Sequence, residues 1–315
     1  MWLAAHDAHR AWDNDIFLEK YKPQSIILDS CFVDDLPTRE DFAAYYNEIS
    51  RFDYYVGKVV EELKKQGVYN NTMIVIMADN GRPFPRAKTR LIDEGIKTPF
   101  IIHYPEMIKN PGSVSKSIIS SIDLAPTIAT LAGVKSPTTF QGKSFVALLS
   151  NPDKTFRNYA FAEHNWHDFE AYERMVCTEK YILIENKRPQ LDAQGAIDIM
   201  GGGAGQSLKK GYKDRTLTAF QREIFITPRN SVELYDRTSD PKQLKNIASE
   251  NPSIVKDLQK VLHKWQNETC DTEPAQLTPD WYYRETLKQI SAKNQRKEMA
   301  GEAKNAKLCL KKGPF

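Results

Sequence analysis

The chain has 315 residues, which is enough for one large domain or two medium ones. Its 44 basic and 41 acidic residues leave a formal net charge of +3. This balance disfavours a dedicated nucleic-acid binder, because such proteins concentrate Lys and Arg on one face. The sequence holds no run of about 18 apolar residues, so we expect no membrane-spanning helix.

Strand-like and helix-like patterns alternate through residues 1–150, which favours a parallel sheet flanked by helices. Met1–Ala5 is apolar, lacks the basic segment of a signal peptide, and is predicted to be a buried strand. A domain rarely opens in mid-strand, so we expect further chain before this segment. The apolar runs 73–78 and 99–104 predict strands that are buried on both faces.

Two helices are predicted in the same region. Apolar residues recur at every third or fourth position over 38–67 and so form one stripe on a helix face. They are Phe42, Tyr45, Ile49, Phe52, Val56, Val59 and Leu63. Thr38 is expected to cap this helix, and Gly67 to follow its last turn. A shorter helix is predicted over 124–131, with Gly133 just past its end.

Residues 151–275 show a different pattern, in which short strands are separated by turns, and predict a smaller α+β subdomain with a short antiparallel sheet. The predicted strands cover 159–162, 180–184 and 232–236. Gly201–Gly205 is expected to be a flexible loop. Apolar spacing predicts a helix over 253–265. Residues 276–315 are polar and basic and are expected to form a loosely held tail.

The cysteines are spread along the chain without a Cys-x-x-Cys spacing, at Cys31, Cys177, Cys270 and Cys309. This pattern predicts neither a zinc site nor a dense disulfide framework. We expect mostly structural thiols, with one disulfide as the alternative if the protein is exported.

A candidate metal site follows the predicted strand 73–78. Asp79-Asn80-Gly81 stands directly after this strand, and ligands of open α/β sheets bind beyond the carboxyl ends of strands. A carboxylate and an amide offer the hard oxygen ligands that Ca²⁺ or Mg²⁺ prefers. Asn-Gly is also a common turn dipeptide, so a simple turn is the alternative.

Two further residues are candidates for binding an anion. Lys88 could neutralise an anion bound near the metal and the charge that grows on its oxygens. His9 follows the first predicted strand and could donate to a sulfate or phosphate oxygen, or protonate a leaving group. The alternatives are a solvated lysine in a loop and a surface histidine.

Candidate sugar contacts cluster around the strand predicted at 159–162. His164 and His167 follow that strand, and Arg174 comes soon after with aromatic neighbours. An arginine in such surroundings can hold an anionic sugar with its planar fork. We therefore predict these three residues as contacts to a substrate sugar.

Several motifs occur together in one order. His9-Arg10 comes first, and behind it stand Asp79-Asn80-Gly81, Lys88, 93–100, 122–128, 233–236, Asp240-Pro241 and Asn246. Across residues 1–275 this series resembles the type I sulfatases of the alkaline-phosphatase superfamily. The stretches 79–85 and 234–237 look most like the heparan N-sulfatase (sulfamidase) branch.

The resemblance implies a fold. Residues 1–150 would be the C-terminal part of an alkaline-phosphatase-like α/β domain, in which helices sandwich the sheet. Residues 151–275 would be its smaller α+β subdomain, with a short antiparallel sheet. By this resemblance, the N-terminal part of the catalytic domain would precede Met1.

The resemblance also implies roles for the candidate residues. Asp79 and Asn80 would be two ligands of a Ca²⁺ ion, with Mg²⁺ as an alternative. Lys88 would contact the sulfate and the nucleophile, and His9 a sulfate oxygen or the leaving group. The candidate contacts to the sugar would be His164, His167 and Arg174.

The sequence departs from the family at the nucleophile. Sulfatases use a cysteine matured to formylglycine within Cys-x-Pro/Ser-x-Arg, and no cysteine here has that context. The family's paired aspartate ligands are also missing, and Asp34-Asp35 lies in the wrong place. In the family both features precede the position of His9, so we expect them before Met1. Ca²⁺ takes about six to eight oxygen ligands, and no covalent intermediate forms without a nucleophile. We expect this chain alone to be inactive.

The parent activity implied by the resemblance is hydrolysis of sulfate esters or sulfamides on sugars, in a periplasmic or extracellular protein. Its partner would be a sulfated saccharide, with no nucleic acid and no membrane span. A phosphatase or phosphodiesterase of the same superfamily is one alternative, which the six histidines disfavour because those enzymes use more metal-binding His. The other is a non-catalytic sulfoglycan-binding module, which would bind sulfated sugars without turnover.

Overall fold

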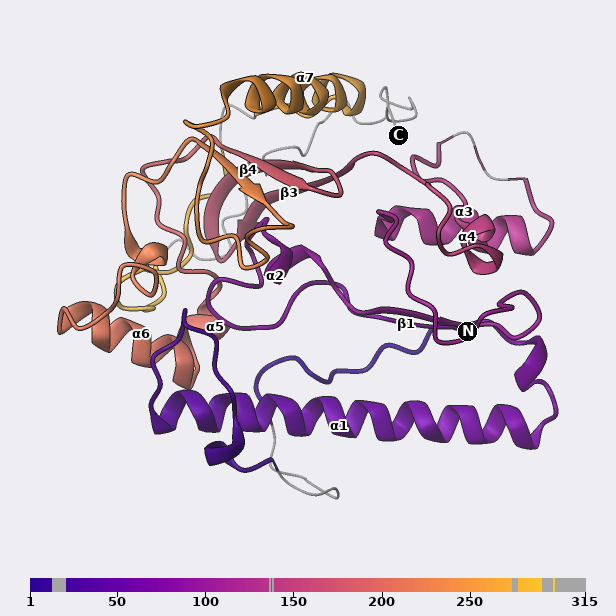
Figure 1. The fold of residues 1–315 in the computed structure, drawn as a ribbon. Coiled ribbons are helices and arrows are strands. Elements are labelled where there is room, and N and C mark those ends of the chain that lie inside the picture. The colour runs from indigo at the N-terminus through magenta and orange to yellow at the C-terminus, as the bar shows by residue number, and fades with distance from the viewer. Residues whose placement is uncertain (13–20, 136, 138, 274–276, 291–296, 298–315) are drawn as a thin grey trace.

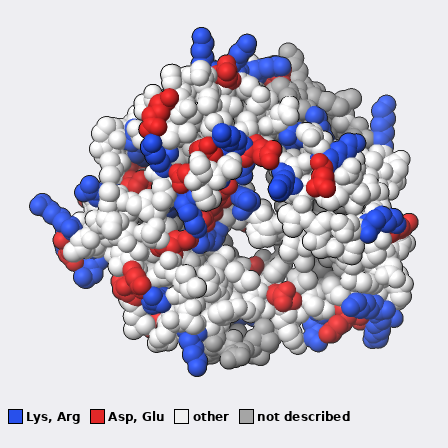
Figure 2. All heavy atoms as spheres, in the orientation of Figure 1, with Lys and Arg blue, Asp and Glu red and all other residues white. Residues whose placement is uncertain are grey.

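The structure, a computed structural model, describes residues 1–12, 21–135, 137, 139–273, 277–290 and 297. Cys309 and most of the predicted tail lie outside these residues. Within them, no helix is long and apolar enough to cross a membrane. On the face drawn in Figure 2, basic and acidic side chains are interspersed rather than gathered by sign.

The long helix α1 spans Leu36–Lys65, as the apolar stripe predicts. Its N-cap is Asp35, whose side chain accepts the backbone N–H of Thr38, so the prediction that Thr38 is the cap was wrong. Gly67 follows the last turn at φ 73° and donates its N–H to the carbonyl of Lys64, which ends the helix as predicted.

The first sheet consists of β1 (Ile74–Met77) and β2 (Phe100–His103). These strands occur where they were predicted, but they pair antiparallel, so the expected parallel pairing is wrong here. They are also only partly buried, and Ile101 is 58% exposed. An apolar run shows that a strand needs covering, but it does not show which strand lies beside it or in which direction.

Met1–Ala5 was predicted to be a buried strand, and that prediction is wrong in this structure. The segment has no strand conformation, and its residues are exposed. No described strand pairs with it. Trp2 and Leu3 therefore face solvent, although the segment is apolar.

The second sheet has four antiparallel strands in the order β3-β4-β5-β6. The strands are β3 (Ala160–His167), β4 (Phe169–Cys177), β5 (Tyr181–Asn186) and β6 (Val232–Asp236). Three of them were predicted, and β4 was not. Helix α7 (Pro252–Thr269) lies across this sheet (Figure 1) and packs Leu258 and Leu262 on it.

The glycine-rich stretch 201–205 is helical rather than a flexible loop, so that prediction was wrong. Helix α5 (Ile197–Gly201) ends there, and α6 (Gly203–Lys213) begins. A Cβ on Gly203 would lie 2.4 Å from the carbonyl oxygen of Pro37. Glycine is therefore needed at this position because α6 approaches the start of α1 more closely than a side chain allows.

The remaining elements are short. They are α2 (Asp93–Ile96), α3 (Leu124–Leu131), α4 (Val146–Ser150), η1 (Pro23–Ser25), η2 (Tyr69–Asn71), η3 (Ser121–Asp123) and η4 (Glu223–Phe225). Helix α3 begins and ends as predicted, and Gly133 follows it at φ 67°.

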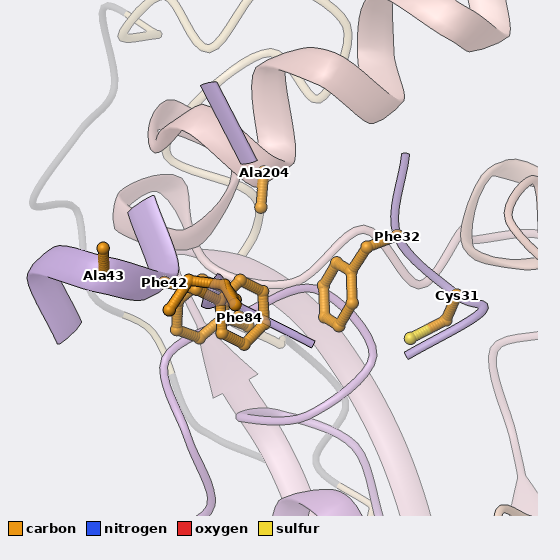
Figure 3. Packing of buried hydrophobic residues seen from close by; sticks show 7 residues of the cluster. Cys31, Phe32, Phe42, Ala43, Phe84 and Ala204 are labelled. Atoms are coloured by element: carbon orange, nitrogen blue, oxygen red, sulfur yellow. The ribbon is translucent and has the colours of Figure 1, made fainter. Parts of the chain in front are cut away.

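An aromatic cluster joins α1 to the loop that follows β1. The rings of Phe42 and Phe84 stack with their centroids 3.9 Å apart, and Phe32 meets Phe42 edge-on at 4.9 Å (Figure 3). Ala204 of α6, Cys31, Ile26 and Ala43 belong to the same cluster. Since Phe84 lies between Gly81 and Lys88 in the sequence, this packing fixes the loop that carries the candidate site.

The described cysteines differ in state. Cys31 and Cys177 are buried free thiols, as expected for structural cysteines. Cys270 is disulfide-bonded, which agrees with the alternative that one disulfide forms.

Candidate functional site

The turn after β1 packs closely against α2. Gly81 donates its N–H to the carbonyl of Gly95 at 2.8 Å. A Cβ on Gly81 would lie only 1.9 Å from the carbonyl oxygen of Glu94. Only glycine permits this close approach. The Asn-Gly pair is therefore more than a surface turn, because it packs the end of β1 against α2.

The candidate metal ligands stand at the start of this turn. Asp79 is exposed, and its Oδ1 accepts the N–H of Asn80 at 2.9 Å. Asn80 donates its Nδ2 to the carbonyl of Gly81 at 2.7 Å, which leaves its amide oxygen as the atom suited to a cation. No three His, Cys, Asp or Glu residues gather into a metal-binding group anywhere in the described part of the chain. The pair supplies hard oxygens, but it fits only part of a Ca²⁺ site.

Lys88 is buried beside an acidic partner. Its side chain is 9% exposed, and its Nζ lies 3.3 Å from Oδ2 of Asp198 on α5. The other oxygen of Asp198 is buried and makes no hydrogen bond in the structure. A lysine held this way is not the solvated loop charge that its sequence context also allowed.

His9 is exposed, and its ring stands 5.4 Å from that of His6. No hydrogen bond or ion pair connects it to Lys88 or Asp79 among the residues described. The neighbouring Arg10 is instead the anchor of this segment: its guanidinium forms two hydrogen bonds to Asp41 of α1, at 2.7 and 2.8 Å. No local pattern in the sequence indicates that pairing.

A pocket of about 420 Å³, a volume that includes the open space at its mouth, lies between the Lys88 loop and the second sheet. Thr89 and Arg90 line it from the loop, and His164 and His167 line it from β3. The structure therefore brings both predicted histidines to the stretch of chain that carries Lys88.

His167 is held by the residue that follows it. Its Nδ1 lies 3.2 Å from Oδ2 of Asp168, and the same oxygen accepts the N–H of Ile197 at 3.2 Å. Burial by itself would raise the pKa of Asp168, but these two hydrogen bonds together with the charges of His167 and Lys88 outweigh it and lower the pKa. The carboxylate is therefore ionised and fixes the orientation of the imidazole.

The predicted sugar contact by Arg174 is not supported by its position. Its side chain is fully buried and forms a two-pronged ion pair with Asp271, at 2.6 and 2.7 Å. Successive residues of a strand point to opposite faces, so Glu173 lines the pocket and Arg174 lies on the other side of β4. Arg174 holds the sheet to the chain beyond α7.

A buried network of charges beneath the pocket was not predicted. Arg90 donates to Glu223 at 2.9 Å, and Glu173 forms an ion pair with Arg229. Burial would raise the pKa of Glu173, but the charge of Arg229 and a hydrogen bond from His164 keep it well below its usual range. The partners of each pair lie far apart in the sequence. The one local feature that could have indicated this network is the alternation of basic residues around Lys88.

Comparison with known proteins places this geometry in a family. The model of the Sulfatase family matches residues 2–134. The model described as N-sulphoglucosamine sulphohydrolase, C-terminal, matches residues 87–199. These matches cover β1, Asp79, Asn80, the Lys88 loop and the pocket histidines.

Individual relatives agree with this match. An ulvan-active sulfatase of Formosa agariphila is 31% identical over 237 residues, which cover 72% of this chain and 38% of the relative. The N-sulphoglucosamine sulphohydrolase of Homo sapiens is 27% identical over 321 residues, with 91% and 64% covered. A protein solved with its substrate D-glucosamine-2-N,6-O-disulfate aligns with a TM-score of 0.56 at 24% identity, covering 77% of this chain and 44% of that one.

The chain belongs to the sulfatase family, of which it carries part of the catalytic domain. Within the family, residues 87–199 match the C-terminal part of the N-sulphoglucosamine sulphohydrolase type. The predicted family and the predicted alkaline-phosphatase-like fold class are thereby confirmed. The chain spans 38% and 64% of the lengths of the two relatives named.

Proposed function

We propose that the complete protein hydrolyses sulfate esters or sulfamides of sulfated glycans, and that this chain supplies the Lys88 loop and the sugar pocket. The position of Lys88 carries the proposal. Its ammonium is buried beside Asp198, and the next two residues of the loop, Thr89 and Arg90, line a pocket that two histidines also line, within a sulfatase domain. Relatives named for N-sulfated glucosamine, N-acetylglucosamine-6-sulfate and ulvan support a sulfated sugar as substrate.

The chemistry follows from burial. Charge grows on the sulfate oxygens as the bond to the sugar breaks, and a cation placed there in advance stabilises it. The effect is strongest where water is excluded, because the local dielectric constant is low. In this proposal Lys88 binds the sulfate, and Asp198 keeps its ammonium in place. His164 and His167 contact the sugar, and His9 serves the sulfate or the leaving group.

The test is sulfate release by the complete protein. Lys88→Ala is expected to lower turnover by at least about 100-fold, the scale for loss of one such stabilising group. Lys210→Ala is the matched control, because that lysine is exposed on α6 and pairs with Asp214 at the surface. Near-normal sulfate release by Lys88→Ala would refute the assigned role.

We also propose that Asp79 and Asn80 supply two ligands of a Ca²⁺ ion, with Mg²⁺ as the alternative. The remaining ligands and the formylglycine nucleophile would come from parts of the protein that this chain does not contain. The bound ion would polarise the sulfate. Calorimetric Ca²⁺ titration of the complete protein tests this: Asp79→Asn should weaken binding, and an unchanged affinity would refute it.

We propose a periplasmic or extracellular location as well. The disulfide at Cys270 supports it, because disulfides persist in oxidising compartments. Fractionation of the producing cells tests the location, and recovery of the protein in the cytosolic fraction with a reduced Cys270 would refute it.

A further inference from the structure

One carboxylate holds both ends of the loop 86–90, which has Lys88 at its centre. Oε2 of Glu223 accepts a hydrogen bond from Nε of Arg86 at 3.0 Å, and its Oε1 accepts one from Nη2 of Arg90 at 2.9 Å. The arginine side chains are 6% and 4% exposed, whereas that of Glu223 is 32% exposed. Glu223 therefore bridges the residues that stand two positions before and two positions after Lys88.

The bridging carboxylate is ionised. Burial by itself would raise the pKa of Glu223, but the charges of Arg90 and other nearby arginines, with a hydrogen bond from Arg86, outweigh it and lower the pKa. An ionised carboxylate accepts hydrogen bonds through both oxygens, and a guanidinium group only donates. Each oxygen of Glu223 is thus matched to one of the two arginines.

The backbone between the two arginines has a conformation that its residues do not favour. Arg86 has φ 62°, and Thr89 has φ 74°. Positive φ is uncommon for any residue with a side chain, and it is a genuine outlier for a β-branched residue such as threonine. Such a conformation persists only where the surrounding contacts determine it. The bridge through Glu223 supplies contacts at both ends of this stretch.

Glu223 and the partner of Lys88 stand on the same apolar cluster. Glu223 begins η4, and the next residue, Ile224, packs in the buried cluster that also contains Ile199 of α5. Asp198 precedes Ile199 on α5, and its Oδ2 lies 3.3 Å from Nζ of Lys88. One packed unit therefore holds the loop in two ways, because Asp198 holds the ammonium and Glu223 holds the chain on either side of it.

We propose that Glu223 is a positioning residue for the reaction: by bridging Arg86 and Arg90 it fixes the loop, and so keeps the ammonium of Lys88 where it meets the sulfate. This inference rests on the proposed function, since Glu223 acts through Lys88 and needs no contact with sugar or sulfate. A shift of about 1 Å in a group that acts on the reacting atoms can lower the rate about 100-fold.

The test variant is Glu223→Gln in the complete protein. Glutamine has the same shape but only one acceptor oxygen, so it can serve one arginine and turns N–H donors toward the other. Arg86→Lys is the second test variant, because it keeps the positive charge but loses the planar fork. The matched control is Glu185→Gln, since Glu185 is also a buried carboxylate but pairs with His263 of α7.

The first readout is the kinetics of sulfate release. We expect both test variants to lower kcat at least about tenfold and to change KM less than about twofold, because the lost interaction acts in the transition state. Glu185→Gln should keep the kcat of the parent. In the Lys88→Ala background, Glu223→Gln should lower kcat by less than about a further twofold, because its effect passes through Lys88. A merely structural residue would lower kcat by the same factor in both backgrounds.

The second readout does not depend on turnover. With isotope-labelled lysine, the NMR signal of the Lys88 ammonium is identified by its absence from Lys88→Ala. We expect its chemical shift to change in both test variants and to stay the same in Glu185→Gln, because only the test variants release the loop.

An unchanged kcat in Glu223→Gln, an equal loss of kcat with and without Lys88, or an unchanged Lys88 signal would overturn the inference. If Glu223→Gln does not fold, the same criteria applied to Arg86→Lys decide. Failure of the proposed function has a different result, namely near-normal sulfate release by Lys88→Ala itself.

Discussion

Replacing Arg229 with methionine tests the buried network beneath the pocket. The side chains of Arg229 and Glu173 are 11% and 3% exposed, so solvent screens their ion pair little. Methionine keeps the length of the side chain but leaves Glu173 as a buried carboxylate without its cation. Breaking a buried pair in this way costs about 3–5 kcal/mol. We expect the free energy of unfolding at neutral pH to fall by that amount.

The dependence on pH gives a second check. In the parent protein the pKa of Glu173 is lowered, so its stabilising contribution is full above the ordinary carboxyl range and is lost as the pH falls below it. Without Arg229, burial is opposed only by His164 and Arg90, so the pKa of Glu173 rises. The cost of Arg229→Met should therefore be largest at neutral pH and shrink as Glu173 takes up a proton.

The assay is urea unfolding followed by circular dichroism at neutral and mildly acidic pH. The double variant Arg229→Met with Glu173→Gln removes both charges and should recover most of the lost stability. Arg39→Met is the control, since Arg39 pairs with the exposed Asp34. A loss below about 1 kcal/mol at neutral pH, on the scale of a surface pair, would refute the reasoning.

Two further substitutions test how the candidate site is held. Phe84→Ala removes a fully buried ring from the aromatic cluster and should cost about 3–5 kcal/mol in urea unfolding; a cost like that of an exposed Tyr55→Ala would contradict the packing. Gly81→Ala places a Cβ 1.9 Å from the carbonyl oxygen of Glu94 and should cost about 1–3 kcal/mol. Gly57→Ala, which meets nothing within 4 Å, is its control, and equal unfolding free energies for the two variants would refute the close approach.

Long periodic patterns predicted the helices well. The stripe over 38–67 became α1, and the one over 253–265 became α7. Both patterns arise because one face of a helix must be buried, which the sequence records directly. The sequence does not show the direction in which β1 and β2 pair. An apolar run indicates only that a strand favours burial, not which strand lies beside it.

The missed strand β4 shows why the sequence was not sufficient. Its residues include Glu173 and Arg174, whose charges indicate an exposed segment. In the structure both are buried, because Glu173 is paired with Arg229 and Arg174 with Asp271. A buried charge becomes predictable only once its partner is known, and these partners lie 56 and 97 residues away in the sequence.

The candidate site likewise has residues that local sequence patterns predict and contacts that they do not predict. Asp79 and Asn80 could be proposed from a motif directly after a strand, and Lys88 from its spacing to them. The burial of Lys88 against Asp198 and the hold of Glu223 on both ends of its loop depend on contacts between distant segments. These contacts are visible only in the structure. The structure also shows that Arg174 does not line the pocket.

The central claim is best tested by measuring which anion the complete protein releases. N-sulfoglucosamine, N-acetylglucosamine-6-sulfate and glucosamine-6-phosphate would be incubated with it in parallel, and free sulfate and phosphate would be quantified by ion chromatography. The account predicts sulfate release from at least one sulfated sugar and little release of phosphate. Release of phosphate in excess of sulfate, or no release of sulfate from either sugar, would contradict it.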